Sequence, residues 1–246
     1  MGMRWVYLSP HFDDVVLSSA GLVWEQGQSG QQVEMWTICA GTPAKDAPLS
    51  AFARQLHTRW QTEDEAVSAR QKEDFAAACR LGVGLRYWDL PDCIYRQLPD
   101  DTWLVNGEED LWKPVHPLEM PVVERLAGWL AQGLHPDDAL VSPLTLGNHV
   151  DHFLVRAAAE RLGRPLWYYA DYPYAVGAST DLAGKTGEGW QKVCYQVSRA
   201  AFGAWQDSVG SYASQISTFW GGLDEMRAAL ETYWRSGGGT CLWKPG

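Results

Sequence analysis

Short apolar runs alternate with longer segments of helical periodicity along most of the chain. Runs rich in β-branched and aromatic residues occupy positions 4–9, 33–40, 85–90, 139–142 and 165–170. Between these runs, apolar residues recur at helical spacing over positions 15–24, 62–81, 121–132 and 148–162. Strands that alternate with helices in this way form a parallel sheet with crossover helices. The pattern therefore predicts an α/β fold with a mostly parallel sheet flanked by helices.

Two long connections interrupt the alternation. Residues 43–60 have mixed composition, and a connection of this length in a compact domain is more often a lid or binding loop than a plain linker. The pattern Thr-Glu-Asp-Glu at 62–65 predicts the start of the helix that follows. Residues 99–117 are polar and rich in Asp and Glu, which predicts a surface excursion.

The C-terminal third is harder to interpret. Beyond residue 170 the periodicity weakens, and only one helix is expected there, near 223–234. No internal repeat or linker divides the chain. We therefore predict a single domain over residues 1–246, with an α/β core at 1–170 and an irregular, aromatic-rich C-terminal cap at 171–246. The aromatic residues of the cap are expected to pack in the core or in a homo-oligomer interface.

Charge and composition narrow the possible partners. The 20 Lys and Arg residues against 30 Asp and Glu residues give a net charge of -10, which disfavours nucleic acid because phosphate contacts need a basic face. No apolar run approaches the roughly 18 residues that cross a bilayer, and we expect a cytoplasmic protein without a transmembrane segment. The five cysteines form no C-x-x-C pair, so we expect buried reduced thiols.

Two loops that follow strands are dense in metal-binding residue types. His11-Phe12-Asp13-Asp14 comes directly after the first predicted strand, and His149-Val150-Asp151-His152 follows the fourth. In an open α/β sheet, ligands bind beyond the carboxyl ends of the strands. Hydrolytic zinc typically takes three His or carboxylate ligands and keeps one position for water. Two histidines and one aspartate from these loops would satisfy zinc, and another carboxylate would remain for proton transfer.

The second loop also contains a predicted helix start. If Asn148 is the N-cap, Asp151 is placed to complete a capping box, and His149 and His152 share one helix face. Asp151 then either caps the helix or orients a histidine.

The two motifs resemble those of the PIG-L/LmbE-type zinc-dependent de-N-acetylases, which remove acetyl groups from N-acetylglucosamine conjugates. The first signature of that family is His-Pro-Asp-Asp, and this chain has Phe12 at the proline position. The second signature is His-x-Asp-His, which residues 149–152 match. The resemblance implies that Asp13 is the general base and that His149 stabilises the oxyanion or protonates the leaving amine. It implies zinc, or another divalent metal, bound by His11, Asp14 and His152.

Weaker traces of the same family lie between the two motifs, and the resemblance covers residues 4–161 of a Rossmann-like domain. Arg70-x-x-Glu73 and Asp89-Leu90-Pro91-Asp92 suggest that Arg70 and Asp92 lie near the sugar hydroxyls. Tyr172, after the fifth strand, is a candidate wall of the substrate site. A solvated helix face explains Arg70 and Glu73 equally well, and a turn explains Asp92 equally well.

A second segment matches the first signature literally. His135-Pro136-Asp137-Asp138 precedes the fourth strand, so it is expected at the opposite edge of the sheet, as a plain turn. His57 and His116 have no partner motif and are expected at the surface.

Three functions compete at this point. The first is metal-dependent removal of the N-acetyl group from a small amino-sugar conjugate. The second is hydrolysis of an ester or another acyl bond by the same site. The third is a catalytically idle sugar-binding protein, although none of the residues needed for catalysis is missing.

Overall fold

The computed structural model describes residues 3–61 and 65–246, and within these ranges the strands form one seven-stranded sheet in the order β3-β2-β1-β4-β5-β7-β6. The first five strands run parallel to one another, as the sequence predicts. They are β1 (Arg4–Ser9), β2 (Gln32–Thr37), β3 (Gly84–Tyr87), β4 (Ala139–Pro143) and β5 (Leu166–Tyr169). The α/β class with a mostly parallel, helix-flanked sheet is therefore confirmed.

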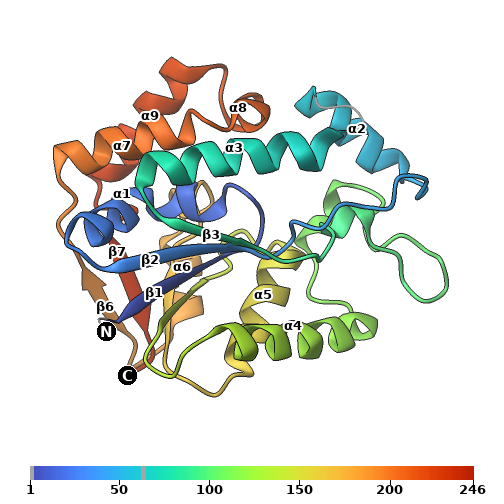
Figure 1. The fold of residues 1–246 in the computed structure, drawn as a ribbon, viewed down its shortest axis with the longest axis horizontal. Helices are drawn as coiled ribbons and strands as arrows, with labels where there is room; N and C mark the ends of the chain where they lie inside the picture. Colours follow the sequence, from blue (N-terminus) through green and yellow to red (C-terminus); the bar gives the residue numbers. More distant parts are fainter. Residues whose placement is uncertain (1–2, 62–64) are drawn as a thin grey trace.

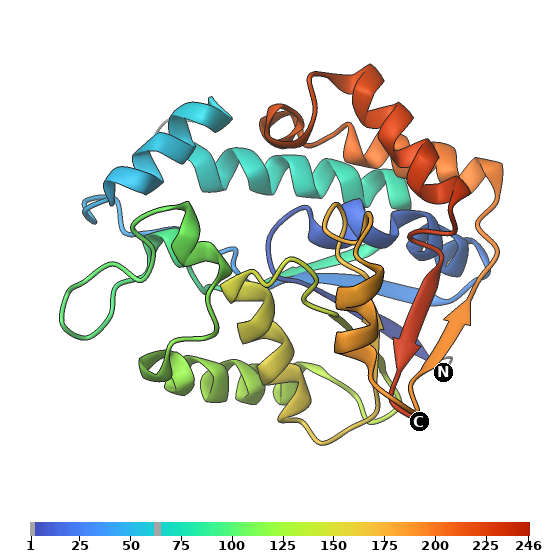
Figure 2. The same cartoon turned by 180° about the vertical axis from the view of Figure 1, so that it is seen from behind.

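Strand β1 is apolar throughout because both faces of the sheet are covered. Successive side chains of a strand point to opposite faces. Trp5 and Tyr7 pack into one hydrophobic cluster, and Val6 and Leu8 pack into another on the opposite face. Figures 1 and 2 show helices on both faces of the sheet. The first face is covered by α1 (Asp14–Gln28), α3 (Ala66–Leu81) and α7 (Arg199–Val209), and the second by α4 (Met120–Gly133) and α5 (Val150–Glu160).

The connection at 43–60 is more regular than predicted. Its second half forms α2 (Ala51–Trp60), which begins where the Ser50 hydroxyl accepts a hydrogen bond from the Ala53 N–H at 2.9 Å. The predicted helix start at 62–64 lies outside the described residues. The polar excursion holds two short 3-10 helices, η3 (Glu108–Trp112) and η4 (Pro117–Glu119), after η2 (Cys93–Tyr95).

The C-terminal third is also more regular than the predicted irregular cap. Strand β7 pairs antiparallel with β5, and β6 pairs with β7 at the edge of the sheet. Only the helix near 223–234 was expected, because the two strands are short and their pairing is non-local. The elements of this part are α6 (Ser179–Thr186), β6 (Gln191–Cys194), α7, α8 (Ala213–Phe219), α9 (Leu223–Arg235) and β7 (Cys241–Lys244).

The cysteine prediction was wrong in part. Cys194 and Cys241 form a disulfide, because the antiparallel register of β6 and β7 places these two residues opposite each other. Their separation of 47 residues hides this pairing from any short-range motif. Cys39 and Cys93 are buried thiols as expected, whereas Cys79 is an exposed thiol.

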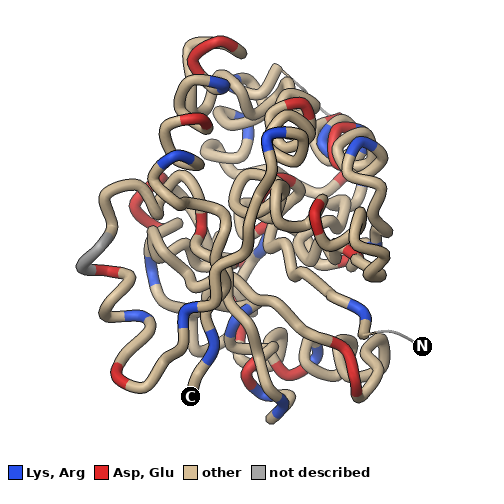
Figure 3. Tube along the Cα trace, turned by 90° about the vertical axis from the view of Figure 1, so that its left-hand side faces the viewer, with Lys and Arg blue, Asp and Glu red and all other residues tan. Residues whose placement is uncertain are grey.

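Charges of both signs are interspersed along the trace in the view of Figure 3. Among the residues that the structure describes, no helix combines the length and the apolarity needed to span a membrane.

Candidate active site

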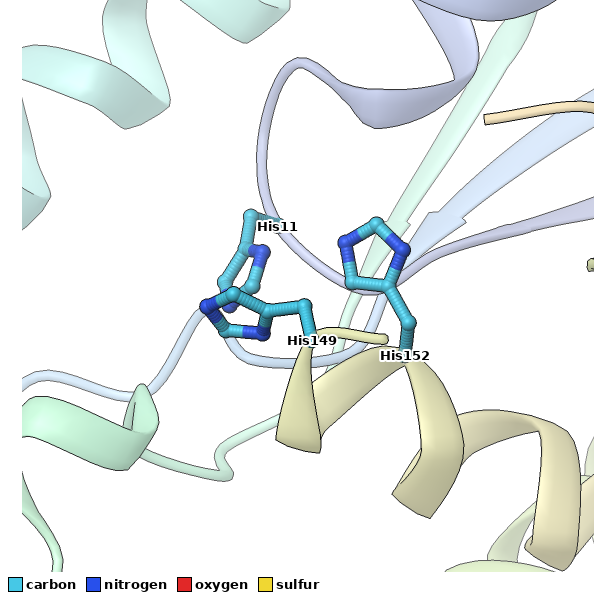
Figure 4. A group of neighbouring side chains, drawn as sticks. All are labelled: His11, His149 and His152. Atoms are coloured by element: carbon cyan, nitrogen blue, oxygen red, sulfur yellow. The ribbon is translucent and has the colours of Figure 1, made fainter. Parts of the chain in front are cut away.

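Three histidines meet beyond the carboxyl ends of β1 and β4. His11 lies in the loop after β1, and His149 and His152 lie at the start of α5 (Figure 4). Their ring centroids are 4.9 Å apart for His11 and His149, 5.6 Å for His11 and His152, and 5.3 Å for His149 and His152. All three are at most 9% exposed. The two loops singled out from the sequence therefore converge, as the sheet-edge argument predicts.

The Asp14 carboxylate contacts two of these imidazoles. Its Oδ2 lies 3.3 Å from Nδ1 of His11, and its Oδ1 lies 3.3 Å from Nε2 of His152. Asp14 is the first residue of α1, and its Oδ2 also accepts the backbone N–H of His11 at 2.7 Å. The tight turn after β1 thus holds a carboxylate and an imidazole against the helix that carries His152.

Hydrogen bonds to two further carboxylates define the tautomers of His11 and His152. Nδ1 of His152 lies 2.6 Å from Asp171 Oδ1, and Nε2 of His11 lies 3.1 Å from Asp151 Oδ2. A carboxylate accepts hydrogen bonds, so these ring nitrogens are the donors. In the neutral form of each ring, the other nitrogen carries a lone pair and faces Asp14. This is the arrangement of metal-ligating histidines, which donate their second N–H to a carboxylate.

His149 differs from the other two histidines because one of its ring nitrogens accepts a hydrogen bond instead of donating one to a carboxylate. Its Nδ1 accepts the backbone N–H of Asp151 at 3.2 Å, because His149 is the N-cap of α5. Burial and the neighbouring His11 and His152 lower the pKa of His149 well below its usual value. In the neutral ring, Nε2 therefore carries the proton and can donate a hydrogen bond. Asn148 is not the N-cap as predicted, since its backbone is left-handed, with φ of 62°, and the helix begins one residue later.

Asp151 does not cap its helix. Its Oδ1 accepts a hydrogen bond from Arg96 at 2.5 Å, and its Oδ2 accepts the backbone N–H of Cys93 at 2.9 Å as well as the bond from His11. Arg96 is itself held by Glu119 at 2.7 Å. The sequence left two roles open for Asp151, capping the helix or orienting a histidine. Its contact with His11 matches the second role.

Asp13 lies beside Arg70 at the same edge. Burial raises the pKa of the Asp13 carboxyl, and the opposite charge of Arg70, whose Nη2 lies 3.3 Å from Oδ1, opposes that rise. Arg70 is 7% exposed, so it does not belong to a solvated helix face. Asp92 Oδ2 lies 3.6 Å from His11 Nε2 and 4.0 Å from Arg70 Nη1. Asp92 also caps η2 through Ile94, so it is both a turn former and part of this cluster.

Among the described residues, three sets of side chains could hold a metal ion: the histidines His11, His149 and His152, and two sets in which a buried thiol, Cys39 or Cys93, joins Asp151 and a histidine. Burial raises the pKa of each thiol well above its usual value. Neither thiol lines the cavity beside the cluster, whereas all three histidines do. Asp14 contacts two of the three histidines, so a carboxylate oxygen also lies beside the all-histidine set.

The cluster opens into a cavity of about 340 Å³. Arg70, Asp92 and Tyr172 all line it together with the histidines and Asp13, so the structure brings the predicted substrate residues to one place. Tyr172 is only 4% exposed, and its ring packs 4.6 Å from that of Tyr233. It therefore belongs to the floor of the cavity more than to an open wall.

The remaining histidines lie elsewhere, and one prediction fails. His57 is buried rather than at the surface, with Nε2 2.6 Å from the Tyr95 hydroxyl. It was misjudged because α2 was not expected. His116 is half-buried and caps η4. Glu73, also considered for substrate contact, instead accepts bonds from the backbone N–H and hydroxyl of Ser214.

Sequence reasoning missed Asp171, Arg96 and Glu119. Asp171 offered a signal, because it directly follows the fifth predicted strand on the same edge as the two motifs. Arg96 and Glu119 lie in irregular segments, and no spacing rule connects them to Asp151.

The chain shows its relationship in three comparisons. The family model described as PIG-L, GlcNAc-PI de-N-acetylase, matches residues 6–162. The 2'-N-acetylparomamine deacetylase of Niallia circulans is 29% identical over 188 residues, 69% of this chain and 67% of that protein. The protein of the same name from Streptomyces fradiae is 31% identical over 183 residues, 70% of this chain and 58% of that protein. The zinc-inhibited form of teicoplanin deacetylase has a TM-score of 0.80 at 28% identity, over 99% of this chain and 97% of that one.

The chain therefore belongs to the PIG-L family of de-N-acetylases, and the resemblance based on the two motifs is confirmed. It is an enzyme of the amidohydrolase class.

Proposed function

We propose that this protein is a zinc-dependent hydrolase that removes the N-acetyl group from an N-acetylglucosamine-type amino-sugar conjugate. The observation that carries the proposal is the division of the three histidines by their hydrogen bonds. Asp151 and Asp171 orient His11 and His152 so that the ring nitrogens facing Asp14 would supply the lone pairs for a metal, whereas the cap geometry leaves the proton of neutral His149 on Nε2. A site with two such ligands and one such donor suits metal-assisted hydrolysis.

His11 Nδ1, Asp14 and His152 Nε2 would hold the metal. When bound, zinc supplies Lewis acidity and lowers the pKa of water to about 7. The outer hydrogen bonds from Asp151 and Asp171 fix the two imidazole rings in the required orientation.

The other residues handle protons and charge. Asp13 accepts a proton from the attacking water while the water oxygen forms a bond to the acetyl carbon. His149 donates its Nε2 hydrogen to the oxyanion that develops on the acetyl oxygen. The C–N bond then breaks, and the sugar nitrogen takes up a proton from Asp13 or His149. The products are acetate and a free amine.

Arg70, Asp92 and Tyr172 are proposed to contact the sugar. Arg70 and Asp92 present charged hydrogen-bonding groups to the cavity, and both lie within 4.0 Å of each other. The named substrates of the two curated relatives and of the solved neighbour support an amino-sugar conjugate of small or moderate size.

A substrate panel tests this proposal. Purified protein supplied with zinc is incubated with an N-acetylglucosaminide, an N-acetyl amino acid and an acetate ester, and acetate and free amine are both measured. We expect acetate and amine in equal amounts from the glucosaminide and little from the other compounds. Acetate from the ester alone would favour the esterase alternative, and amine from the amino acid alone would refute the sugar assignment.

A further inference from the structure

The cavity that holds the catalytic cluster is lined by two chemically different sets of side chains, which meet where the Arg70 guanidinium lies over the Trp60 ring. One set, which we call the catalytic end, consists of the histidines, aspartates and Arg70 described above. The other end is apolar and comes from four elements, α2, η2, η3 and α8, with α2 and α8 in contact. Its main side chains are Phe52, Leu56, Trp60, Ile94, Trp112 and Phe219, which we call the apolar wall. Hydroxyl groups of a sugar do not need this many apolar neighbours.

The apolar wall rests on a small hydrophobic cluster of its own. Phe52, Leu56 and Ile94 are at most 8% exposed and pack with Val150, among others, separately from the two large clusters on the faces of the sheet. Val150 directly follows His149 in the chain. The cluster therefore holds the wall in a fixed position relative to the catalytic end, as a preformed binding surface requires.

Trp112 is the most informative member of the apolar wall. Its ring centroid lies 5.6 Å from that of His149 and 5.7 Å from that of Tyr174, in edge-to-face contacts. It nevertheless remains 38% exposed, one of the few large hydrophobic side chains that the structure describes as exposed. An exposed indole beside the proposed oxyanion donor is placed to cover whatever group leaves the sugar in this direction. Indole rings pack favourably against other aromatic rings.

Charge disfavours a cationic group at this end. The charged side chains that line it within the described residues are Arg59 and Glu108, which are exposed and opposite in sign. The carboxylates at the catalytic end already contact His11 or Arg70. An aglycone with several amino groups would find no excess of negative charge along the wall.

We propose that the apolar wall is a subsite for an aromatic aglycone linked to the N-acetylated sugar. This inference rests on the proposed function and adds the chemical class of the conjugate. The acetamide lies over the catalytic cluster, and the flat aglycone lies against the exposed indole of Trp112, with Phe219 also lining the cavity.

The test compares three N-acetylglucosaminides of one anomeric configuration, with methyl, cyclohexyl and phenyl aglycones, on the zinc-supplied protein. We expect kcat/KM to be about 10-fold higher for the phenyl than for the methyl compound, mainly through KM, with the cyclohexyl compound between them. Equal efficiency for all three would overturn the subsite, and a cyclohexyl compound as good as the phenyl one would overturn the aromatic class.

Two variants assign the effect to the wall. Trp112→Ala and Phe219→Ala should each reduce the phenyl-to-methyl ratio toward 1. Trp129→Ala is the matched control, because Trp129 is half-buried on α4, stacks on Trp88 and does not line the cavity. It should keep the wild-type ratio. A ratio that the wall variants leave unchanged would contradict the inference.

A binding measurement separates this inference from the proposed function. If neither the phenyl nor the methyl compound is hydrolysed, the proposed function fails, and calorimetry with the intact compounds still tests the wall. Tighter binding of the phenyl compound that Trp112→Ala abolishes would support the subsite without the reaction. Equal or undetectable binding of both compounds would overturn it.

Discussion

Two segments of this chain carry nearly the same four residues, and the same local hydrogen bond forms in each of them. In His11-Phe12-Asp13-Asp14, the backbone N–H of His11 donates to Asp14 Oδ2 at 2.7 Å. In His135-Pro136-Asp137-Asp138, the backbone N–H of His135 donates to Asp138 Oδ2 at 2.7 Å. The shared residues therefore give the same side-chain contact in both places, although Asp14 begins α1 and Asp138 follows a turn in which its N–H donates to the His135 carbonyl. This contact does not by itself determine any chemistry.

The surroundings of the two turns differ because they lie at opposite edges of the sheet. The first turn follows β1, and Asp14 meets His152 from the loop after β4. The second turn precedes β4, and Asp138 meets Arg4 at the start of β1, which runs parallel to β4. His135 is exposed, whereas His11 is buried. The polarity of the sheet, more than the match to the family signature, decides which copy can reach the second motif.

The third residues of the two turns give the largest expected difference. Asp13→Asn should keep its metal but lose about 100-fold to 10,000-fold in kcat, because the amide cannot accept the proton of the attacking water. Asp137→Asn should leave kcat unchanged, since Asp137 is exposed at the far edge. Steady-state rates and metal content of both variants are the measurement.

An Asp13→Asn variant with full metal content and nearly normal turnover would exclude Asp13 as the base. A large loss in Asp137→Asn would mean that the wrong turn had been assigned to the site.

The first residues of the two turns, His11 and His135, should differ in their effect on metal affinity. His11→Ala should weaken zinc binding by at least about 100-fold, the upper range for loss of an outer hydrogen-bond partner, because a ligand is removed outright. Asp14→Ala and His152→Ala should behave like His11→Ala. His135→Ala should bind zinc as the parent does. Competition with a chelator measures all four affinities, and normal binding by His11→Ala together with loss in His135→Ala would reverse the assignment.

The sheet was predictable because parallel strands covered on both faces are continuous apolar runs. Segment 4–9 coincides with β1, and the helices at 121–132 and 223–234 are found with small shifts. Helix α2 was missed because residues 43–60 were judged by their length and mixed composition as one connection, although Phe52 and Leu56 have the i, i+4 spacing of a helix. Strands β6 and β7 were missed because they are four residues each and acquire their partners only in the folded chain.

The site residues that directly follow strands in the sequence could be predicted. The two motifs and Asp92 follow strands, and sheet polarity brings them together. The hydrogen bonds that divide the histidines were not readable, because Asp171 comes from another strand end and the N-cap is His149 instead of Asn148. A left-handed residue at Asn148 places the N-cap at His149, whose Nδ1 accepts the backbone N–H of Asp151.

The smallest effect on activity is expected at Asp138, the fourth residue of the second turn. Its replacement should change the stability of the fold instead. Asp138 accepts hydrogen bonds from Arg4 and from the His135 N–H, so Asp138→Ala removes a charge-assisted contact between the starts of β1 and β4. A hydrogen bond to a charged group contributes about 1.5–3 kcal/mol, and Arg4 keeps Glu34 and the Gly133 carbonyl as partners, so the free energy of unfolding should fall by at least about 1.5–3 kcal/mol. Zinc affinity and kcat/KM should not change, because the turn is at the opposite edge from His152. Urea denaturation, chelator competition and rates on the same preparation test both parts. A loss of zinc affinity without a loss of stability would show that the second turn communicates with the site, and the contrast between the two segments would then fail.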